Sequence, residues 1–461
     1  MSLMVSISGI RGIVGSSLTP EVIVKYSSAF AEYCGRGTVV IGRDGRITGK
    51  PVTHIVSSTL ISMGCNVIAL GICPTPTVQI ATERTRATGG ISVTASHNPI
   101  IWNGLKFVDS SGLFLNAKQN KEFWNLADRG DRTYALWDKM GSHTADDTFI
   151  DRHIQSILDL PYINPRALIR REFKVVADCV NAAGGVIVPK LLRKLGCHVV
   201  EMNCDVSGIF AHAPEPVPEN LTALCRRVKA EKADLGIAVD PDADRLVLID
   251  ETGHPFGEEY TIASVVRFVL EKESQLSGRK RSLRRPQVVV NLSTTRAVED
   301  IAKQFGGETH RTAVGEINVA QKMKEVGALV GGEGSGGVIL PSVHLGRDAA
   351  VGIALVIQQL AEFGGSLSAL KRTLPQYSII KGKIDVGRID PDQALQRMKD
   401  RHARRGRINT TDGLRIDFPD SWVHLRKSNT EPIVRIIAEA PTKQEADQLA
   451  VRFTREIRNS R

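Results

Sequence analysis

Three stretches of the chain repeat the same order of hydrophobic and polar positions. Each stretch opens with a β-branched run that predicts a strand, at TVVIGRD (38–44), FKVVADCV (173–180) and QVVVNLS (287–293). Apolar residues at helical spacing follow each run, such as Val188, Leu191 and Leu195 in the second stretch. Glycine then ends each predicted helix, and a second strand begins. The pattern predicts a degenerate threefold repeat of a strand-helix-strand unit.

A third predicted strand closes each unit and runs directly into an unusual loop. The three loops are SHNP from 96, PDADR from 241 and GSGG from 334. Strand-helix alternation predicts parallel sheets, in which ligands bind outside the carboxyl ends of the strands. We therefore expect the three loops to face one cleft.

The last part of the chain follows a different pattern. From about Tyr377 it shows strands in pairs, a helical stretch and a final amphipathic helix from about Lys443, which is an α+β arrangement. We place domain boundaries near 150, 256 and 375. The length of 461 residues agrees, since it suits about three or four domains of roughly 100 to 150 residues.

Composition narrows the class of protein. The chain is 42% hydrophobic and 24% charged, and it has neither an apolar run of the roughly 20 residues that span a membrane nor a secretory signal pattern. We expect a cytoplasmic protein with no membrane partner. The seven cysteines are scattered and never spaced as CxxC, so we expect them to be reduced.

The net charge of +10 suits anionic ligands such as phosphorylated metabolites, and by itself it suits nucleic acid equally well. Much of the excess lies in two basic clusters, at 278–286 and 401–407. Neither cluster contains the aromatic residues that stack on bases. We predict solvated loops there and no nucleic-acid partner.

The DPDADR loop has the composition of a cation site. Asp240, Asp242 and Asp244 alternate, so an extended loop turns all three carboxylates to one side, and such hard oxygen ligands fit Mg²⁺. A calcium EF-hand is a rival, because Glu251 stands at the twelfth place. Arg245 replaces the glycine that an EF-hand needs at the sixth place, and strands flank the loop, so we set this alternative aside.

The remaining loops offer weaker signals, each of which also fits a structural turn. In TASHNP, the proline exposes a turn that carries the Ser96 hydroxyl at the end of a strand. In GGEGSGG, Glu333 and Ser335 supply an acceptor and a donor suited to sugar hydroxyls. RKSNTEP (426–432), with Arg435 after it, has the usual contents of a phosphate pocket.

Taken in order, these motifs resemble the α-D-phosphohexomutase family over essentially the whole chain. The matching motifs are SGIRG, TASHNP, NGLK (103–106), DPDADR, GEGSGG and R-x-S-N-T-E-P. The family comprises phosphoglucomutases, phosphomannomutases and phosphoglucosamine mutases. The resemblance implies an α/β protein of four domains around a central active-site cleft, with three similar mixed α/β units in tandem and a smaller C-terminal α+β domain. The four domains would span residues 1–150, 151–256, 257–375 and 376–461. In that order they would carry the phosphoserine loop, the metal-binding loop, the sugar-binding loop and the phosphate-binding loop.

The resemblance also implies roles for individual residues. Ser96 would carry the phosphoryl group, and Mg²⁺ would be ligated by Asp240, Asp242, Asp244 and a phosphoserine oxygen. Glu333 and Ser335 would grip the sugar hydroxyls at carbons 3 and 4. Arg11 and Arg245 would stabilise charge near the phosphoryl group. Lys106 would be the general acid or base, and His97 a supporting polar group. The phosphate that does not react would be held by Arg426, Ser428, Asn429, Thr430 and Arg435.

Two positions depart from the family pattern. Many relatives have a histidine where this chain has Gly337, and we expect His344 in the next segment to take over its role at the sugar site. Asn429 replaces a glycine of the phosphate loop, which Asn can do because it also adopts left-handed conformations.

The resemblance implies a phosphohexomutase that interconverts hexose 1-phosphates and 6-phosphates of glucose and mannose, and also of glucosamine. The reaction would use a phosphoserine, Mg²⁺ and a bisphosphorylated hexose as intermediate and activator, in a monomer or homodimer. One alternative is a dedicated phosphoglucosamine mutase. Others are a phosphotransferase with Asp240 as nucleophile, although Asp244 stands where that class has Thr or Val, and a non-catalytic module that binds sugar phosphates or nucleic acid.

Overall fold

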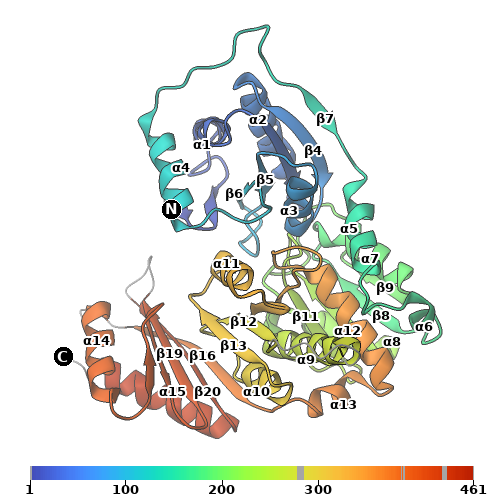
Figure 1. Ribbon diagram of the computed structural model, residues 1–461, viewed down its shortest axis with the longest axis vertical. Helices are drawn as coiled ribbons and strands as arrows, with labels where there is room; N and C mark the ends of the chain where they lie inside the picture. The colour runs from blue at the N-terminus through green and yellow to red at the C-terminus, as the bar shows by residue number, and fades with distance from the viewer. Residues whose placement is uncertain (1–2, 278–284, 386, 388–389, 428–432, 460–461) are drawn as a thin grey trace.

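The computed structural model describes residues 3–277, 285–385, 387, 390–427 and 433–459. The chain forms four domains that follow one another in a curved arrangement, from the blue N-terminal domain to the red C-terminal domain (Figure 1). Each domain is built on one sheet, and the four sheets have seven, four, four and five strands. Among the described residues, no helix combines the length and the apolar composition that crossing a membrane requires.

The first domain contains the seven-stranded sheet, in the order β1-β2-β6-β5-β3-β4-β7. Its strands are β1 (Met4–Ser6), β2 (Gly9–Ile13), β3 (Thr38–Arg43), β4 (Asn66–Ile72), β5 (Gly89–Val93), β6 (Trp102–Asp109) and β7 (His143–Ala145). Its helices are α1 (Pro20–Tyr33), α2 (Gly49–Ser62), α3 (Thr75–Arg84) and α4 (Ala117–Arg129). Two of these helices, α1 and α4, begin at side-chain caps: Thr19 accepts a hydrogen bond from the Val22 amide, and Asn116 forms a capping box with Gln119.

The second and third domains each contain a four-stranded sheet. The second consists of α5 (Phe149–Leu158), α6 (Pro165–Ile169), β8 (Lys174–Asp178), α7 (Gly184–Lys194), β9 (His198–Met202), α8 (Thr222–Glu231), β10 (Leu235–Val239) and β11 (Leu246–Asp250). The third consists of α9 (Glu258–Ser277), β12 (Gln287–Asn291), α10 (Ala297–Gln304), β13 (Glu308–Thr312), α11 (Glu316–Val326), β14 (Val330–Glu333), β15 (Gly337–Ile339), α12 (Ala349–Phe363) and α13 (Leu367–Arg372).

The predicted threefold repeat is confirmed by the strand orders. The four core strands of the three sheets run β6-β5-β3-β4, β11-β10-β8-β9 and β15-β14-β12-β13, which is one topology used three times. The first three strands of each unit pair in parallel, as predicted, but β6, β11 and β15 pair antiparallel. The predicted parallel pairing is confirmed for three strands of each unit, and the fourth makes each sheet mixed. The connecting loops are too short for the dozen or more residues that a parallel crossover needs, so the chain turns back.

The fourth domain has a five-stranded antiparallel sheet covered by two helices. Its elements are β16 (Ser378–Asp385), α14 (Pro391–His402), β17 (Arg407–Asn409), β18 (Leu414–Asp417), β19 (Trp422–Lys427), β20 (Ile433–Ala440) and α15 (Lys443–Arg458). This domain has a hydrophobic core of its own, whereas one continuous core joins the second and third domains. The loops of those two domains are consequently held in a fixed relation.

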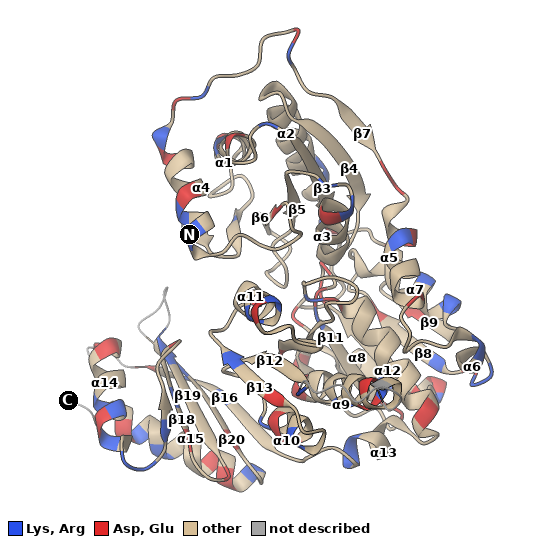
Figure 2. Cartoon of the chain, viewed as in Figure 1, with Lys and Arg blue, Asp and Glu red and all other residues tan. Residues whose placement is uncertain are grey.

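Charged residues are distributed over the outside of the molecule. Helices α4 and α14 carry residues of both signs, whereas the charged residues of α7 are all basic (Figure 2). All seven cysteines are free, as predicted.

Candidate active site

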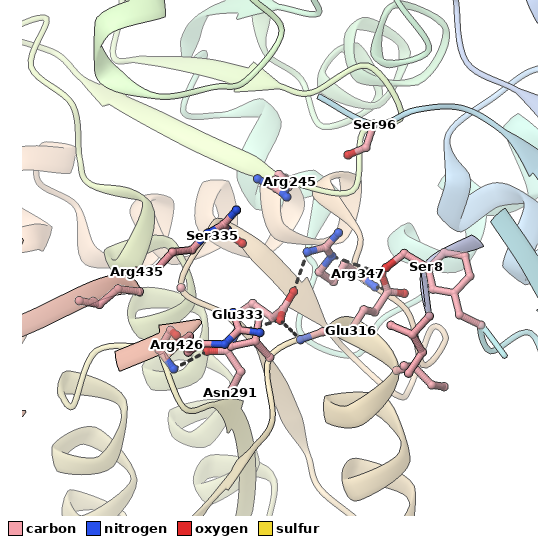
Figure 3. Close-up of a pocket in the computed structure, with 18 of the residues that line it drawn as sticks. Ser8, Ser96, Arg245, Asn291, Glu316, Glu333, Ser335, Arg347, Arg426 and Arg435 are labelled. Atoms are coloured by element: carbon pink, nitrogen blue, oxygen red, sulfur yellow. Dashed lines mark hydrogen bonds and ion pairs between the residues drawn. The ribbon is translucent and has the colours of Figure 1, made fainter. Parts of the chain in front are cut away.

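A cavity of about 320 Å³ lies at the centre of the molecule, and all four domains contribute to its walls (Figure 3). Eight of the residues singled out in the sequence line it: Arg11, Ser96, Lys106, Arg245, Glu333, Ser335, Arg426 and Arg435. The loops that follow the third strand of each repeat therefore meet here. The sequence analysis gave no role to eight further polar residues of the wall: Ser8, Glu259, Asn291, Ser293, Glu316, Arg347, Lys381 and His424.

Ser96 lies on the loop between β5 and β6 and points toward the second domain. Its hydroxyl is 3.1 Å from Asp240 Oδ2, and its amide donates to Thr94 Oγ1 at 2.9 Å. The residue is only 2% exposed, so the expectation of an exposed turn was wrong: the acidic loop of the second domain covers it. Its φ of +50° is left-handed, a conformation that costs a non-glycine residue on the order of 1–3 kcal/mol and persists where the surroundings enforce it.

Arg46 fixes the conformation of the Ser96 loop. Its guanidinium is fully buried and donates to four carbonyl oxygens of the loop and its exit: Ser96 at 2.6 Å, Asn98 at 2.7 Å, Pro99 at 2.8 Å and Trp102 at 3.0 Å. Asp44 pairs with Arg46 Nε at 3.0 Å and also accepts from Thr94. The sequence analysis missed this pair, although polar residues directly after β3 stand at the carboxyl edge of the sheet.

The acidic loop between β10 and β11 buries all three aspartates completely. One carboxylate oxygen from each of Asp240, Asp242 and Asp244 lies within 4.8 Å of the others. Ala243, in the middle of the loop, has a φ of +50°. Asp240 Oδ1 accepts the amides of Asp244 at 3.1 Å and Arg245 at 3.2 Å, which fixes the bend of the loop.

The hydrogen bonding of these aspartates fits a cation. Asp242 Oδ1 and Asp244 Oδ1 are buried and accept no hydrogen bond from any residue that the structure describes. Leaving a buried carboxylate oxygen without a partner is costly, and a divalent metal ion would satisfy both atoms. An all-oxygen set of carboxylates suits hard cations. The three aspartates could therefore hold a metal ion beside the Ser96 hydroxyl.

Lys106 balances part of this negative charge. It projects from β6, is 3% exposed, and places its ammonium 2.6 Å from Asp242 Oδ2 and 3.4 Å from Asp244 Oδ2. Burial alone would lower the pKa of Lys106, but the two carboxylates outweigh burial and raise it. The same pairing lowers the pKa of Asp242 against the effect of burial, whereas burial and the neighbouring Asp244 raise that of Asp240.

Two further groups surround the serine. Arg11 donates to Asn98 Oδ1 at 3.1 Å, next to the turn that carries Ser96. His97 Nδ1 lies 3.3 Å from the Ser96 hydroxyl. Burial, together with the positive charges of Arg245 and Arg11, lowers the pKa of His97 to about 3. His97 is thus a neutral imidazole at physiological pH, available as a hydrogen-bonding group.

The third domain contributes a carboxylate that is held on both oxygens. Glu333 ends β14; its Oε1 accepts from Asn291 Nδ2 at 2.8 Å and from the Gly315 amide at 2.9 Å, and its Oε2 pairs with Arg347 at 2.6 Å. Asn291 ends the neighbouring strand β12, so its place at the strand end was the signal that the sequence analysis left unused. Gly334 permits the tight loop that follows, because a Cβ there would come within 1.9 Å of Glu259 Oε2.

The structure places His344, for which the sequence predicts a role at this loop, away from the cavity wall. His344 is buried outside the cavity wall, and its Nε2 lies 3.1 Å from Asp348, which also binds His153 at 2.7 Å. Arg347, three residues later, occupies the space over Gly337 instead. A Cβ at Gly337 would approach Arg347 Cδ to 2.3 Å, so the arginine requires a glycine at that position.

The fourth domain closes the cavity with two arginines. Arg426 on β19 and Arg435 on β20 are direct cross-strand partners, and Arg426 is oriented by Asp412 at 2.9 Å. Paired guanidinium groups suit a phosphate. Ser428, Asn429 and Thr430, which the sequence assigns to the same pocket, lie outside the described residues.

Comparison with known proteins gives matches over nearly the whole chain. Family models of "Phosphoglucomutase/phosphomannomutase" match residues 4–133 (domain I), 149–253 (domain II), 260–377 (domain III) and 383–456 (C-terminal domain). A relative from Methanopyrus kandleri named "Probable phosphoglucosamine mutase" is 36% identical over 98% of this chain and 97% of its own length.

Two other proteins give the same result. A "Phosphoglucomutase/phosphomannomutase" from Thermococcus kodakarensis is 38% identical over 95% of this chain and 94% of its own. The crystal structure of a phosphoglucomutase/phosphomannomutase family protein from Burkholderia thailandensis superimposes with a TM-score of 0.83 at 27% identity, covering 99% of this chain and 98% of that one.

Proposed function

We propose that Ser96 carries the transferred phosphoryl group, because this chain belongs to the phosphoglucomutase/phosphomannomutase family and is a phosphohexomutase. The proposed reaction interconverts the 1-phosphates and 6-phosphates of glucose and mannose, and also of glucosamine. One observation carries the assignment to Ser96. Its hydroxyl lies 3.1 Å from the buried Asp240, and nearby Asp242 and Asp244 each have a buried carboxylate oxygen that accepts no hydrogen bond from the described residues.

The residues around Ser96 have different proposed roles, which follow from their chemistry. Asp240, Asp242, Asp244 and an oxygen of phosphorylated Ser96 would hold Mg²⁺, which neutralises oxygen charge on the phosphoryl group when it is bound. Arg11 and Arg245 add positive charge next to the serine, and Lys106 serves as the general acid or base. His97 orients the serine oxygen through its neutral ring.

The opposite side of the cavity would hold the substrate. Glu333 accepts a hydrogen bond from a sugar hydroxyl, and Ser335 donates one to a neighbouring sugar hydroxyl. Arg426 and Arg435 bind the phosphate that does not react, together with Ser428, Asn429 and Thr430 of the same loop. The two ends of the cavity then fix a hexose phosphate with its free hydroxyl facing Ser96.

In the forward direction the bond between phosphorus and Ser96 Oγ breaks, and a bond from phosphorus to the free sugar hydroxyl oxygen forms. Lys106, held as an ammonium by its two carboxylate partners, donates a proton to the departing Ser96 Oγ and then takes up the proton that the sugar hydroxyl loses. The product is a bisphosphorylated hexose, which reverses its orientation in the cavity and returns its other phosphoryl group to Ser96. A closed cavity keeps water away from the phosphoserine during this reorientation.

A dedicated phosphoglucosamine mutase is the second candidate, because the relative that is 36% identical carries that name. The aspartyl alternative is disfavoured, since both oxygens of Asp240 are engaged, one by two backbone amides and the other by Ser96.

The test is to incubate the protein with glucose 1,6-bisphosphate and measure its intact mass, then assay glucose, mannose and glucosamine phosphates side by side. We expect one added phosphate that survives both acid and hydroxylamine, and turnover that requires Mg²⁺. Loss of the phosphate in hydroxylamine would point to an aspartyl phosphate and overturn the assignment to Ser96.

A further inference from the structure

We propose that Arg347 is a positioning residue that anchors the sugar-gripping Glu333 to the metal loop at Asp244. The inference rests on the proposed function for the roles of Glu333 and Asp244. Arg347 belongs to none of the motifs that carry the family resemblance, and it lines the cavity between them.

The guanidinium of Arg347 contacts three carboxylates from three segments. Nη2 lies 2.6 Å from Asp244 Oδ2, Nη1 lies 2.6 Å from Glu333 Oε2, and Nε lies 3.3 Å from Glu316 Oε2 at the start of α11. Figure 3 shows Arg347 between Glu333 and Glu316, with Ser96 on the far side of Arg245. One side chain therefore connects the acidic loop of the second domain to the sugar loop of the third.

The shape of the guanidinium explains why an arginine stands here. Its planar fork presents donors in fixed directions, so the two terminal nitrogens can bind two different carboxylates at once, whereas a lysine offers a single point charge. If one of these contacts is lost, the carboxylate on that side keeps its other partners but is no longer tied to the opposite loop: Asp244 keeps Lys106 at 3.4 Å, and Glu333 keeps the hydrogen bonds to its Oε1. A displacement of about 1 Å at such a site can cost on the order of 10²-fold in rate.

The surroundings fix Arg347 in turn. Its amide donates to Glu316 Oε1 at 3.2 Å, and the next residue, Asp348, caps α12 by accepting the amides of Ala350 and Val351. Gly337 leaves the space in which the arginine stem lies, since a Cβ there would come within 2.3 Å of Arg347 Cδ. A substitution at Gly337 should therefore displace Arg347 without changing any charge.

The experiment compares Arg347→Gln, Arg347→Lys and Gly337→Ala with Arg311→Gln as a matched control. Arg311 pairs with Glu299 at 2.6 Å in the same domain, and its side chain is 9% exposed against 10% for Arg347, but it does not line the cavity. The readouts are kcat/KM, the calorimetric Kd of glucose 6-phosphate and thermal stability.

We expect Arg347→Gln to lower kcat/KM by about 10²-fold and to raise the Kd at least tenfold. Arg347→Lys and Gly337→Ala should raise the Kd by at least fivefold, because each retains the charge and loses the alignment. Arg311→Gln should leave both quantities within twofold of the wild type, even if it lowers stability. In a Glu333→Gln background, Arg347→Gln should change the Kd less than threefold, because its effect acts through Glu333.

A purely structural role for Arg347 predicts additive effects on Kd in the Glu333→Gln background, and that result overturns the proposal. If Arg347→Gln fails to fold, the other two variants decide: an unchanged Kd in both of them contradicts it. The Kd measurement needs no turnover. A wild type that binds glucose 6-phosphate but has no mutase activity would refute the proposed function while leaving the Arg347 inference open to the same comparison.

Discussion

The Ser96 hydroxyl and the Asp240 carboxylate are 144 residues apart in the chain and meet at 3.1 Å across the boundary between the first and second domains. The contact places a nucleophilic oxygen against the acidic loop, where a phosphoserine and a metal ion would share ligands. The side chain is buried yet lines the cavity, so its importance should lie in chemistry more than in packing.

Ser96→Ala should therefore abolish mutase turnover and leave the fold intact. Removing the hydroxyl loses its hydrogen bonds to Asp240 and His97, each of which contributes about 1 kcal/mol to stability, but it removes the only phosphoryl carrier in the proposal. Circular dichroism and thermal unfolding should resemble those of the wild type, and intact mass should show no phosphate after incubation with bisphosphate. Residual turnover above 1% of the wild type would assign the carrier to another residue.

Asp242→Asn should weaken Mg²⁺ binding and raise the Mg²⁺ concentration needed for half-maximal activity. The change replaces one negatively charged carboxylate ligand by a neutral amide. It also removes the negative charge that faces the Lys106 ammonium. Titration of activity with Mg²⁺ in chelator-treated enzyme measures the shift. Full wild-type activity in excess EDTA would contradict the metal site altogether.

Arg46→Lys should lower kcat without removing any group that contacts substrate. A lysine cannot reach the four carbonyls that Arg46 holds, so the Ser96 loop loses its fixed geometry, and we expect a fall of about 10²-fold in kcat. Unsatisfied buried carbonyls should also cost about 1–3 kcal/mol each in stability. Arg311→Lys, at a buried site away from the loop, controls for general destabilisation; equal kcat losses in the two variants would argue against a clamp.

The loops and the repeat could be predicted because their signals are local. Asp240, Asp242 and Asp244 lie within five residues, and their alternation after an apolar run is visible without any tertiary contact. Arg46 and Arg347 gave no such signal, since their function is defined by carbonyls and carboxylates that the fold brings from other segments.

The position of His344 could not be predicted for the same reason. In the segment HLGRD, sequence alone cannot tell which side chain faces the cavity. The structure turns Arg347 inward and directs His344 toward Asp348 and His153, where it completes a buried polar cluster. The burial of Ser96 was missed for a related reason: the residues that cover it come from the second domain.

Stability should depend on pH through Glu259. Burial raises the pKa of this carboxyl from 4.5 to about 7, against the opposing charge of Lys381. The folded state thus binds more protons than the unfolded state between these pH values, and stability falls as pH rises through them, by about 3 kcal/mol in total. Glu259→Gln removes this cost, so its Tm relative to the wild type should increase between pH 4.5 and 7.

The neighbouring Glu258→Gln is the matched control for that comparison. Glu258 also pairs with Lys381, but its side chain is 27% exposed against 9% for Glu259, so it should not reproduce the trend. Parallel Tm curves for wild type and Glu259→Gln over this range would show that Glu259 does not titrate there.

The last prediction concerns the sugar. Glu333 and Ser335, which we propose to grip the hydroxyls at carbons 3 and 4, contact groups that glucose, mannose and glucosamine phosphates share, so carbon 2 is read weakly. A site that hydrogen-bonds a distinguishing group rejects analogues by roughly 10⁴-fold or more, whereas one that only accommodates it discriminates by about 10 to 200-fold.

We therefore expect activity on at least two of these sugar phosphates, with kcat/KM ratios below about 10³. Glucose and mannose phosphates form the first pair, with glucosamine phosphate close behind them. Parallel assays of all three, in the presence of the corresponding bisphosphate, give the ratios directly. A preference for glucosamine phosphate beyond that margin would favour the dedicated enzyme and would mean that a residue outside the loop at 333–335 reads the amino group. Glu259, a buried carboxylate in the cavity wall beside Gly334, would then be the first position to substitute.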